Sequence, residues 1–287
     1  MKRFLFFIVA ILLSLTSIAQ KTDKKLTEKI NELIKGFKGD IGIYVHDLER
    51  NRIVSINADT VFPTASMVKV PILVGIMDKM NKHELDYHQT LTYTNSLFYD
   101  DGDVVGNLKD SAKIELSKVI MLMLTTSDNT ASLWLQQLAG TGTRINQLMD
   151  ENGFAVTRVN SRTPGRENNR TQYGWGQTSP REMAQLMELI ATKKLLNDTA
   201  SEKMLRLLGR NYWDEQALSQ IPAGVFVASK NGAVNASRSE VLYVNADDAR
   251  YIFCICTKNN QDKSWENSNE AWVLTNRLSK MLWEYFN

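Results

Sequence analysis

The spacing of apolar residues changes twice along this chain of 287 residues, and helical periodicity dominates its middle. Residues 25–37 carry apolar side chains at helical spacing, which predicts an amphipathic helix. Residues 40–48 and 52–57 are short apolar segments joined by a polar turn, and we expect two strands there. The N-terminal part of the fold is therefore predicted to be one helix and a pair of strands.

From Pro63 to about residue 210 the pattern is helical, most clearly over residues 117–140 and 179–196. A polar stretch with Gly, Pro and Asn, residues 161–180, interrupts these helices. Loops of that length without periodicity are usually functional or disordered. The middle of the chain is therefore predicted to be all-helical, with one long loop.

Strand character returns near the C-terminus, in residues 223–232, 239–246 and 250–258. A final helix is expected because one apolar stripe is formed by Leu274, Leu278, Met281, Leu282 and Tyr285. Strands at both ends of the chain and helices between them predict an α/β (α+β) fold. We expect an antiparallel five-stranded sheet flanked by the terminal helices, with an all-helical lobe inserted.

The predicted domain covers residues 20–287. Its α/β lobe is formed by residues 20–61 and 213–287, and its helical lobe by residues 62–212. A functional site is expected in the cleft between the two lobes, because ligand pockets commonly lie at such boundaries.

Residues 1–19 have the pattern of a secretory signal peptide: Lys2 and Arg3, an apolar core, and the small-residue site Ser17-Ile18-Ala19. The apolar core is short for a transmembrane span, although a retained membrane anchor is the alternative. We expect cleavage before Gln20, a periplasmic or secreted protein, and no stable membrane anchor afterwards.

Composition excludes several classes of function. Removal of residues 1–19 takes two cations and no acids, which leaves 32 basic and 32 acidic residues. A balanced charge gives no electrostatic basis for binding nucleic acid or an anionic membrane. We therefore expect a small-molecule substrate and a monomer.

The cysteines and histidines give no sign of a disulfide, a metal site or a cofactor. Cys254 and Cys256 alternate on one predicted strand and share a face, where we expect them to be small buried residues. The three histidines are scattered, and no zinc-ligand spacing occurs.

Candidate chemistry begins in FPTASMVKVPIL, where Ser66 stands three residues before Lys69. A Ser-x-x-Lys tetrad alone is weak, because about one is expected by chance in a chain of this length. The apolar surroundings strengthen it, since a buried lysine has a lowered pKa and could accept the proton of Ser66.

Two further motifs support this interpretation, although each has an ordinary structural explanation. Ser127-Asp128-Asn129 could be a helix N-cap. Lys230-Asn231-Gly232 could be a hairpin turn, for which Asn-Gly is a strong signal. Each pattern occurs once, and the three follow the order of Ser-x-x-Lys, Ser-Asp-Asn and Lys-Thr-Gly in class A β-lactamases and penicillin-binding proteins.

From about residue 40 to the C-terminus, the sequence resembles the class A β-lactamase family. The segments FPTASMVKV, MLTTSDNTASLWL and TSPREMAQLM carry the resemblance. It implies that Ser66 attacks the substrate carbonyl, that Lys69 helps to deprotonate Ser66, and that Ser127 relays a proton to the leaving nitrogen.

The same resemblance implies binding positions. Asn129 would hold the substrate amide, and Lys230 would supply positive charge to the substrate carboxylate and to Ser127. The backbone amides of Ser66 and Ala233 would form an oxyanion hole, next to Gly232 of the third motif.

The sequence departs from the family pattern at two places. Asn231 replaces the usual Thr or Ser of the third motif. In the long loop, Thr163 falls near the position of the family's deacylating glutamate, and Glu167 comes several residues late. Hydrolysis of the acyl-enzyme therefore depends on whether Glu167 reaches the site. The alternative role for Glu167 is an ion pair that holds the loop.

Two other residues are weaker candidates. Arg238 could pair with a substrate carboxylate or could be a solvated residue of an edge strand. Tyr99 could form a wall of the cleft or could pack locally.

The sequence therefore predicts an exported serine hydrolase that opens β-lactams through acyl-Ser66. The alternatives are a D,D-carboxypeptidase or penicillin-binding-type enzyme that acts on peptidoglycan stem peptides, and a non-enzymatic β-lactam-binding module.

Overall fold

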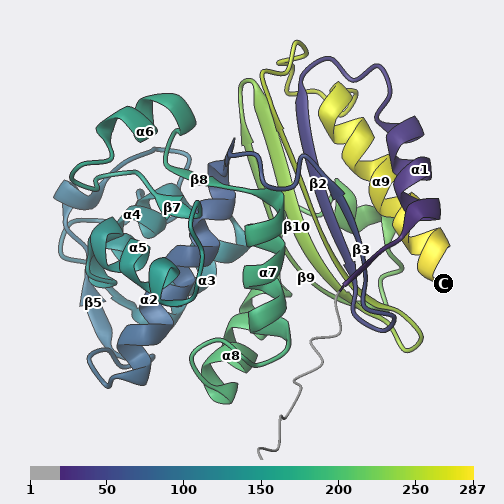
Figure 1. Ribbon diagram of the computed structural model, residues 1–287. Helices are drawn as coiled ribbons and strands as arrows, with labels where there is room; N and C mark the ends of the chain where they lie inside the picture. The colour runs from purple at the N-terminus through teal and green to yellow at the C-terminus, as the bar shows by residue number, and fades with distance from the viewer. Residues whose placement is uncertain (1–19) are drawn as a thin grey trace, which may run out of the picture.

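The computed structural model describes residues 20–287, and its centre is a six-stranded sheet (Figure 1). The strands are β1 (Lys21–Thr22), β2 (Asp40–Asp47), β3 (Arg52–Ile56), β9 (Phe226–Val234), β10 (Ser237–Asn245) and β11 (Arg250–Lys258). Their order in the sheet is β1-β3-β2-β11-β10-β9, so the N-terminal strands form one half of the sheet and the C-terminal strands the other, and the helical lobe comes between them in sequence. All neighbours are antiparallel except β1, which pairs in parallel with β3.

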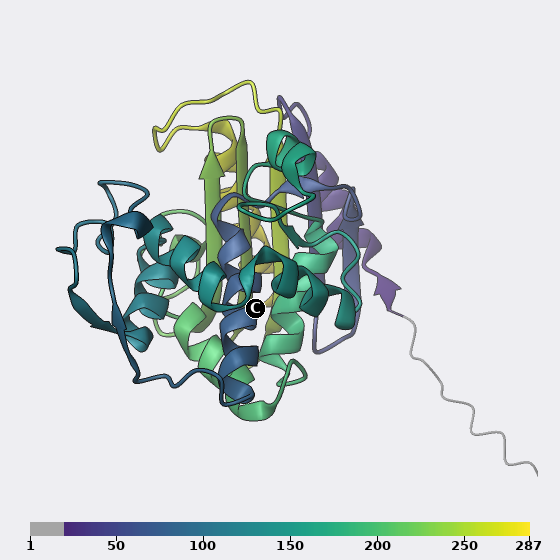
Figure 2. The ribbon, with the colours of Figure 1, turned by 90° about the vertical axis from the view of Figure 1, so that its left-hand side faces the viewer.

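Helices cover both faces of this sheet. On one face, α1 (Lys24–Leu33) and α9 (Glu270–Phe286) pack over a core that includes Ile43, Leu242 and Phe253. On the other face, α7 (Pro180–Ala191) contacts β2, β10 and β11. The turned view shows the helical lobe in front of the sheet (Figure 2).

The helical lobe is built around α2 (Lys69–Asn81), in which every residue from Lys69 to Asp78 is buried. Pro71 lies in the first turn of α2, where a proline costs little because the first backbone N–H groups have no partner within the helix. The other helices are α3 (Leu116–Thr125), α4 (Asn129–Leu138), α5 (Thr141–Glu151), α6 (Glu167–Tyr173) and α8 (Asp198–Leu208), with the 3₁₀ turns η1 (Ala65–Val68), η2 (Asn95–Leu97) and η3 (Ala217–Gln220).

Two small sheets fix loops of this lobe. Strand β8 (Gly176–Thr178) pairs with both β4 (Phe62–Pro63) and β7 (Arg158–Val159). Strands β5 (Thr90–Thr92) and β6 (Lys113–Glu115) pair with each other. Because β4 directly precedes η1, the first of these sheets joins the segment that carries Ser66 to both ends of the long polar loop.

The predicted fold class is confirmed, with the five long strands and the terminal helices in the expected places. The two-residue strand β1 and the two small sheets were not predicted, because pairs and triplets of residues carry no periodicity. The expected signal peptide lies outside the described residues. No helix within residues 20–287 is long and apolar enough to cross a membrane.

The two cysteines also lie as the alternation of strand residues predicts. Cys254 and Cys256 are buried in β11, unbridged, with their Sγ atoms 3.7 Å apart.

Candidate active site

Ser66 lies in η1, the tight turn that joins β4 to α2. The turn begins at Ala65, whose φ of 43° lies in the left-handed region that a residue with a side chain seldom adopts. Such local strain is a common feature of functional sites. The turn presents Ser66 to the cavity between the lobes, and the first turn of α2 follows directly after it.

Lys69, the first residue of α2, has its amino group among four oxygen atoms. Nζ lies 3.1 Å from Ser66 Oγ, 3.0 Å from Ser127 Oγ and 2.9 Å from Asn129 Oδ1. It also lies 2.6 Å from the carbonyl oxygen of Ser127. The first and second motifs, separated by about 60 residues of sequence, therefore meet at one nitrogen atom.

The environment of Lys69 favours the neutral amine. The side chain is fully buried, and this desolvation holds its pKa well below the usual range, with a further lowering from the nearby charge of Lys230. Asp103 and Asp128 oppose the shift but do not cancel it. A neutral lysine 3.1 Å from a serine hydroxyl is arranged as a general base requires.

The second motif caps a helix and also contacts Lys69. Asp128 is the N-cap of α4, because its Oδ1 accepts a hydrogen bond from the backbone N–H of Ala131 at 2.7 Å. Ser127, with a φ of 62°, is in the left-handed conformation, and both its carbonyl oxygen and its hydroxyl oxygen contact Lys69. Capping by the middle residue thus leaves the two outer residues free to face Lys69.

Asp103 is a supporting residue that the sequence did not reveal. Its buried carboxylate accepts hydrogen bonds from the backbone N–H of Asn129 at 2.8 Å and from that of Thr130 at 2.6 Å. The hydroxyl of Thr130 adds a third hydrogen bond at 2.8 Å. Asp103 stands in an acid-rich loop sequence, DDGD, where no pattern separates a buried aspartate from exposed ones.

The third motif lies within β9 rather than at a turn, so the hairpin-turn explanation is wrong. Gly232 is required there, because a Cβ at this position would lie 2.5 Å from the carbonyl oxygen of Thr64 and 2.7 Å from the backbone nitrogen of Ser66. The backbone of β9 therefore packs directly against the segment that carries Ser66. This close approach suits the expected oxyanion hole, which would use the amides of Ser66 and Ala233.

Lys230 is fully buried, and burial lowers its pKa to about 7, although the charge of Glu240 partly opposes the shift. Its Nζ donates to the carbonyl oxygen of Asn231 at 3.0 Å and lies 3.2 Å from Asn231 Oδ1. The amide that replaces the usual hydroxyl of this motif thus contacts the neighbouring lysine.

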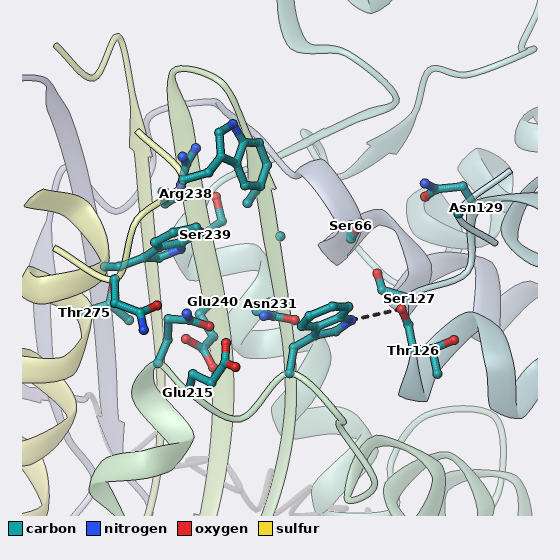
Figure 3. A pocket seen from close by; sticks show the side chains of 18 of the residues that line it. Ser66, Thr126, Ser127, Asn129, Glu215, Asn231, Arg238, Ser239, Glu240 and Thr275 are labelled. Atoms are coloured by element: carbon teal, nitrogen blue, oxygen red, sulfur yellow. Dashed lines mark hydrogen bonds between the residues drawn. The ribbon is translucent and has the colours of Figure 1, made fainter. Parts of the chain in front are cut away.

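These segments border a cavity of about 530 Å³ between the lobes (Figure 3). Its lining includes Ser66, Ser127 and Asn129 from the helical side, and Asn231, Gly232 and Ala233 from β9. Trp213 also lines it and donates from Nε1 to the carbonyl oxygen of Thr126 at 2.9 Å. The sequence did not single out Trp213, which joins the segment before η3 to the end of α3.

Arg238 lines the same cavity but is neither solvated nor free. Its guanidinium lies between two indole rings, 4.6 Å from the centroids of both Trp265 and Trp272. It donates to the carbonyl oxygens of Ser237 at 3.0 Å and Ser264 at 2.8 Å, and also to that of Val234. A solvated edge-strand position is therefore wrong for Arg238, and its contact with a substrate carboxylate stays a prediction.

The structure does not bring Glu167 into this cavity. Glu167 is exposed at the start of α6, where its Oε1 accepts a hydrogen bond from the backbone N–H of Gly165 at 3.1 Å. The alternative, an ion pair that holds the loop, is also not seen among the described residues. The loop is instead held by Arg166, which donates to Asn160 Oδ1 at 3.0 Å and to Gln177 Oε1 at 2.8 Å.

Thr163 is buried, and its hydroxyl donates to the carbonyl oxygen of Ser161 at 2.9 Å. No carboxylate from residues 160–175 lines the cavity.

Tyr99, which was a possible wall of the cleft, is partly exposed and stacks edge-to-face on Trp175, with ring centroids 4.9 Å apart. Within residues 20–287 no cluster of His, Cys, Asp or Glu could hold a metal ion.

The model of the β-lactamase enzyme family matches residues 25–286. The chain belongs to this family. β-Lactamase VEB-1 of Pseudomonas aeruginosa is 21% identical over 307 residues, which cover 99% of this chain and 98% of that protein. β-Lactamase SME-1 of Serratia marcescens is 23% identical over 244 residues, which cover 81% of this chain and 79% of that protein.

Two solved structures share the fold. A β-lactamase from Chitinophaga pinensis superposes with a TM-score of 0.82 at 20% identity, over 92% of this chain and all of that chain. PBP-A superposes with a TM-score of 0.81 at 23% identity, over 93% of this chain and 97% of that chain. A variant of PBP-A has been solved as an acyl-enzyme complex with penicillin G.

Proposed function

We propose that this member of the β-lactamase family is an exported serine hydrolase that opens β-lactams through an acyl-Ser66 intermediate. The observation that carries the proposal is the placement of a buried, neutral-favouring Lys69 within 3.1 Å of both Ser66 Oγ and Ser127 Oγ. Acyl transfer needs a nucleophile and a base. Here the hydroxyl of Ser66 and a second hydroxyl, that of Ser127, both lie within reach of the Lys69 amine.

The proposed reaction runs in two proton transfers. Lys69 takes the proton of Ser66 as Oγ attacks the lactam carbonyl carbon, and the backbone amides of Ser66 and Ala233 stabilise the oxyanion. Ser127 then passes a proton to the departing nitrogen as the C–N bond breaks. Asn129 would hold the amide of the substrate side chain, beside the amine that it already contacts at 2.9 Å.

A second candidate function is favoured by the position of Glu167. Because Glu167 is exposed and the described loop offers no carboxylate to the cavity, activation of the hydrolytic water lacks its usual base. This arrangement fits a D,D-carboxypeptidase or penicillin-binding-type enzyme. β-Lactams acylate such an enzyme, and the acyl group is released slowly. The similarity of this fold to that of PBP-A supports the same alternative.

The experiment that tests these proposals is intact-mass measurement after mixing with benzylpenicillin, over minutes to hours. We expect the mass of the protein to increase by one penicillin, with loss of the adduct in Ser66→Ala and its retention in the exposed control Ser96→Ala. A transient adduct indicates a β-lactamase, and a persistent one indicates a penicillin-binding-type enzyme. Absence of any adduct in the wild-type protein would contradict both.

Export is proposed from the signal-like sequence of residues 1–19. N-terminal sequencing of protein recovered from the periplasm or medium should give Gln20 as the first residue. Recovery of Met1 would contradict both cleavage and the periplasmic assignment.

A further inference from the structure

Residues 211–213, which lie between α8 and η3, connect β9 to the end of α3. Asn211 Nδ2 donates to Ser229 Oγ in β9 at 3.1 Å, and Asn211 Oδ1 accepts the backbone N–H of Trp213 at 3.2 Å. At the other end, Trp213 Nε1 donates to the carbonyl oxygen of Thr126 at 2.9 Å, a bond drawn as the dashed line beside Thr126 in Figure 3. We call residues 211–213 the cross-lobe strap.

The two ends of the cross-lobe strap are bonded to the residues that precede the second and third motifs. Thr126 stands directly before Ser127 in sequence, and Ser229 stands directly before Lys230. Within residues 20–287, the hydrogen bonds of the Lys230 amine go to Asn231 and not to Ser127. The strap is therefore a physical connection between two motifs that do not bond to each other.

Three consecutive carbonyl groups follow one another at the end of α3, and each has a donor from outside that helix. The backbone N–H of Tyr212 donates to the carbonyl oxygen of Thr125 at 3.0 Å. The indole of Trp213 bonds to that of Thr126, and the amine of Lys69 bonds to the next one at 2.6 Å. Carbonyl groups at the end of a helix have no partner within it, so these outside donors decide how they are oriented.

The hydrogen bond from Trp213 also acts on the residue that follows Thr126. The carbonyl group of Thr126 and the nitrogen of Ser127 belong to one planar peptide unit, so a bond to the oxygen also orients the N–Cα bond of Ser127. Ser127 has a φ of 62°, and a residue with a side chain keeps this conformation only where its surroundings impose it. The indole N–H of Trp213 is one of the contacts that impose it.

Contact with a substrate is the alternative explanation of Trp213, because its side chain lines the cavity and the residue is 42% exposed. Asn211 separates the two explanations. It is half-buried and does not line the cavity, and its side chain bonds to Ser229 and Trp213. A substitution of Asn211 therefore disturbs the strap without removing a group that faces the cavity.

We propose that Trp213 is a positioning residue, which holds Ser127 in the orientation that protonation of the leaving nitrogen requires. The proposal rests on the acyl-transfer function proposed above. In that reaction the proton of Ser66 passes to Lys69, and the Ser127 hydroxyl gives its own proton to the nitrogen as the C–N bond breaks. Lys69 then returns a proton to Ser127, whose Oγ lies 3.0 Å from Nζ. Loss of the strap should therefore slow the departure of a nitrogen more than the attack by Ser66.

The test compares acylation by two substrates whose leaving groups differ in their need for a proton. Benzylpenicillin releases an amine nitrogen, which must be protonated as it departs. N-acetyl-D-alanyl thioglycolate releases a thiol that is acidic enough to leave as its anion. In the thioester reaction the Ser66 Oγ–acyl bond forms, the C–S bond breaks, and the proton of Ser66 stays on Lys69. Quenched-flow intact-mass measurement over a range of substrate concentrations gives the acylation rate and the apparent dissociation constant separately.

Trp213→Phe keeps an aromatic ring and removes the N–H donor. We expect it to slow acylation by benzylpenicillin about 10-fold more than acylation by the thioester, a ratio that corresponds to about 1.4 kcal/mol, as for one lost hydrogen bond. Asn211→Ala should change the ratio in the same direction by a smaller factor. Tyr212→Phe is the matched control and should keep the wild-type ratio, because it alters the neighbouring exposed ring and keeps the backbone N–H that bonds to Thr125.

Equal slowing of the two reactions in Trp213→Phe, or a change only in the apparent dissociation constants, would overturn the proposal. A ratio that changes in Trp213→Phe and not in Asn211→Ala would assign the effect to contact between the ring and the substrate, and would also overturn it. Absence of acylation of the wild-type protein by both substrates would instead contradict the proposed function.

Amide hydrogen exchange tests the positioning without any reaction. The backbone N–H of Asp128 donates to the carbonyl oxygen of Leu122 at 3.2 Å, within the turn that holds Ser127. Mass spectrometry of the peptide that contains this turn should show faster exchange in Trp213→Phe than in the wild-type protein and in Tyr212→Phe. Equal exchange in all three proteins would overturn the proposal whether or not the protein is acylated.

Discussion

The amino nitrogen of Lys69 lies closer to the carbonyl oxygen of Ser127, at 2.6 Å, than to the hydroxyl of either neighbouring serine. A carbonyl oxygen can only accept a hydrogen bond, so one N–H of the amine is directed at the backbone of the second motif. The lone pair of a neutral amine is then available to a hydroxyl. The left-handed conformation of Ser127 thus helps to set the orientation of the Lys69 amine, and not only the position of its own side chain.

Lys69→Arg should abolish acylation although it keeps a positive charge. Arginine cannot be deprotonated in a protein, and its planar guanidinium does not fit a site built for one nitrogen atom. We expect the rate of penicillin adduct formation to fall by about 10²–10⁴-fold, the usual contribution of a general base. Lys82→Arg, in a partly exposed ion pair with Asp78, is the control. Near-normal acylation in Lys69→Arg would show that Lys69 acts only through its charge.

Gly232→Ala should damage both the site and the stability of the protein. The added methyl group would lie 2.5 Å from Thr64 O and would push β9 away from the segment that carries Ser66. Overpacking of this kind costs about 1–3 kcal/mol, which should lower the melting temperature by several degrees and slow acylation. Gly224→Ala is a matched control, because a Cβ at that position meets nothing within 4 Å. An unchanged melting temperature and acylation rate in Gly232→Ala would show that β9 and η1 pack less closely than described.

Glu167→Gln should leave both acylation and release of the acyl group unchanged. The carboxylate is exposed, bonds to the backbone of Gly165, and does not line the cavity. Burst kinetics with a chromogenic cephalosporin, with the wild-type protein beside the variant, measure both steps. Slower release by 10²-fold or more in the variant would restore Glu167 as the base for the water.

The stability of the protein should fall as the pH rises from about 4.5 to about 7 because of Glu240. Its pKa in the folded state is raised from 4.5 to about 7 by burial, so the folded protein holds the proton more tightly than the unfolded chain does. The stabilisation is therefore complete below the unfolded pKa and is lost as the pH passes the folded pKa, by on the order of 3 kcal/mol.

Lys230 should change the stability in the opposite direction, and over a higher range of pH. Its pKa is lowered from 10.5 to about 7, so stability should rise between about pH 7 and pH 10.5 as the unfolded chain loses its excess proton.

Urea unfolding at a series of pH values, for the wild-type protein and Glu240→Gln, measures the contribution of Glu240. The variant should lack the fall between pH 4.5 and 7, and an identical slope in both proteins would assign the fall to other groups.

The order of elements could be predicted because long strands and amphipathic helices leave periodic patterns. The residues around Lys69 could be predicted only through motif order, since no periodicity places Ser127 beside Ser66. The loop could not be predicted, because the position of Glu167 depends on tertiary contacts such as those of Arg166 with Asn160 and Gln177.

Glu240 illustrates a different limit of the sequence. In SRSEVLYV a glutamate on a strand suggests a solvent-facing position, and Arg238 is the more conspicuous charge. The pairing register of β9 and β10, set by the residues of the turn between them, puts Glu240 rather than Arg238 beside Asn231. Glu240 and Arg238 share one face of β10, and a shift of one residue in the register would move both to the opposite face, so the partner of Asn231 could not be predicted without the structure.

The small sheet of β4, β7 and β8 has a consequence for how this protein can diversify. It closes the long loop at its base and, through β4, holds the strand that leads to Ser66. We therefore expect that residues between its two clamped ends can be exchanged without moving Ser66. Under the proposed mechanism, attack on the substrate and release of the product would then be separately adjustable, so that changes confined to this loop would convert a long-lived acyl-protein into a fast hydrolase, or the reverse.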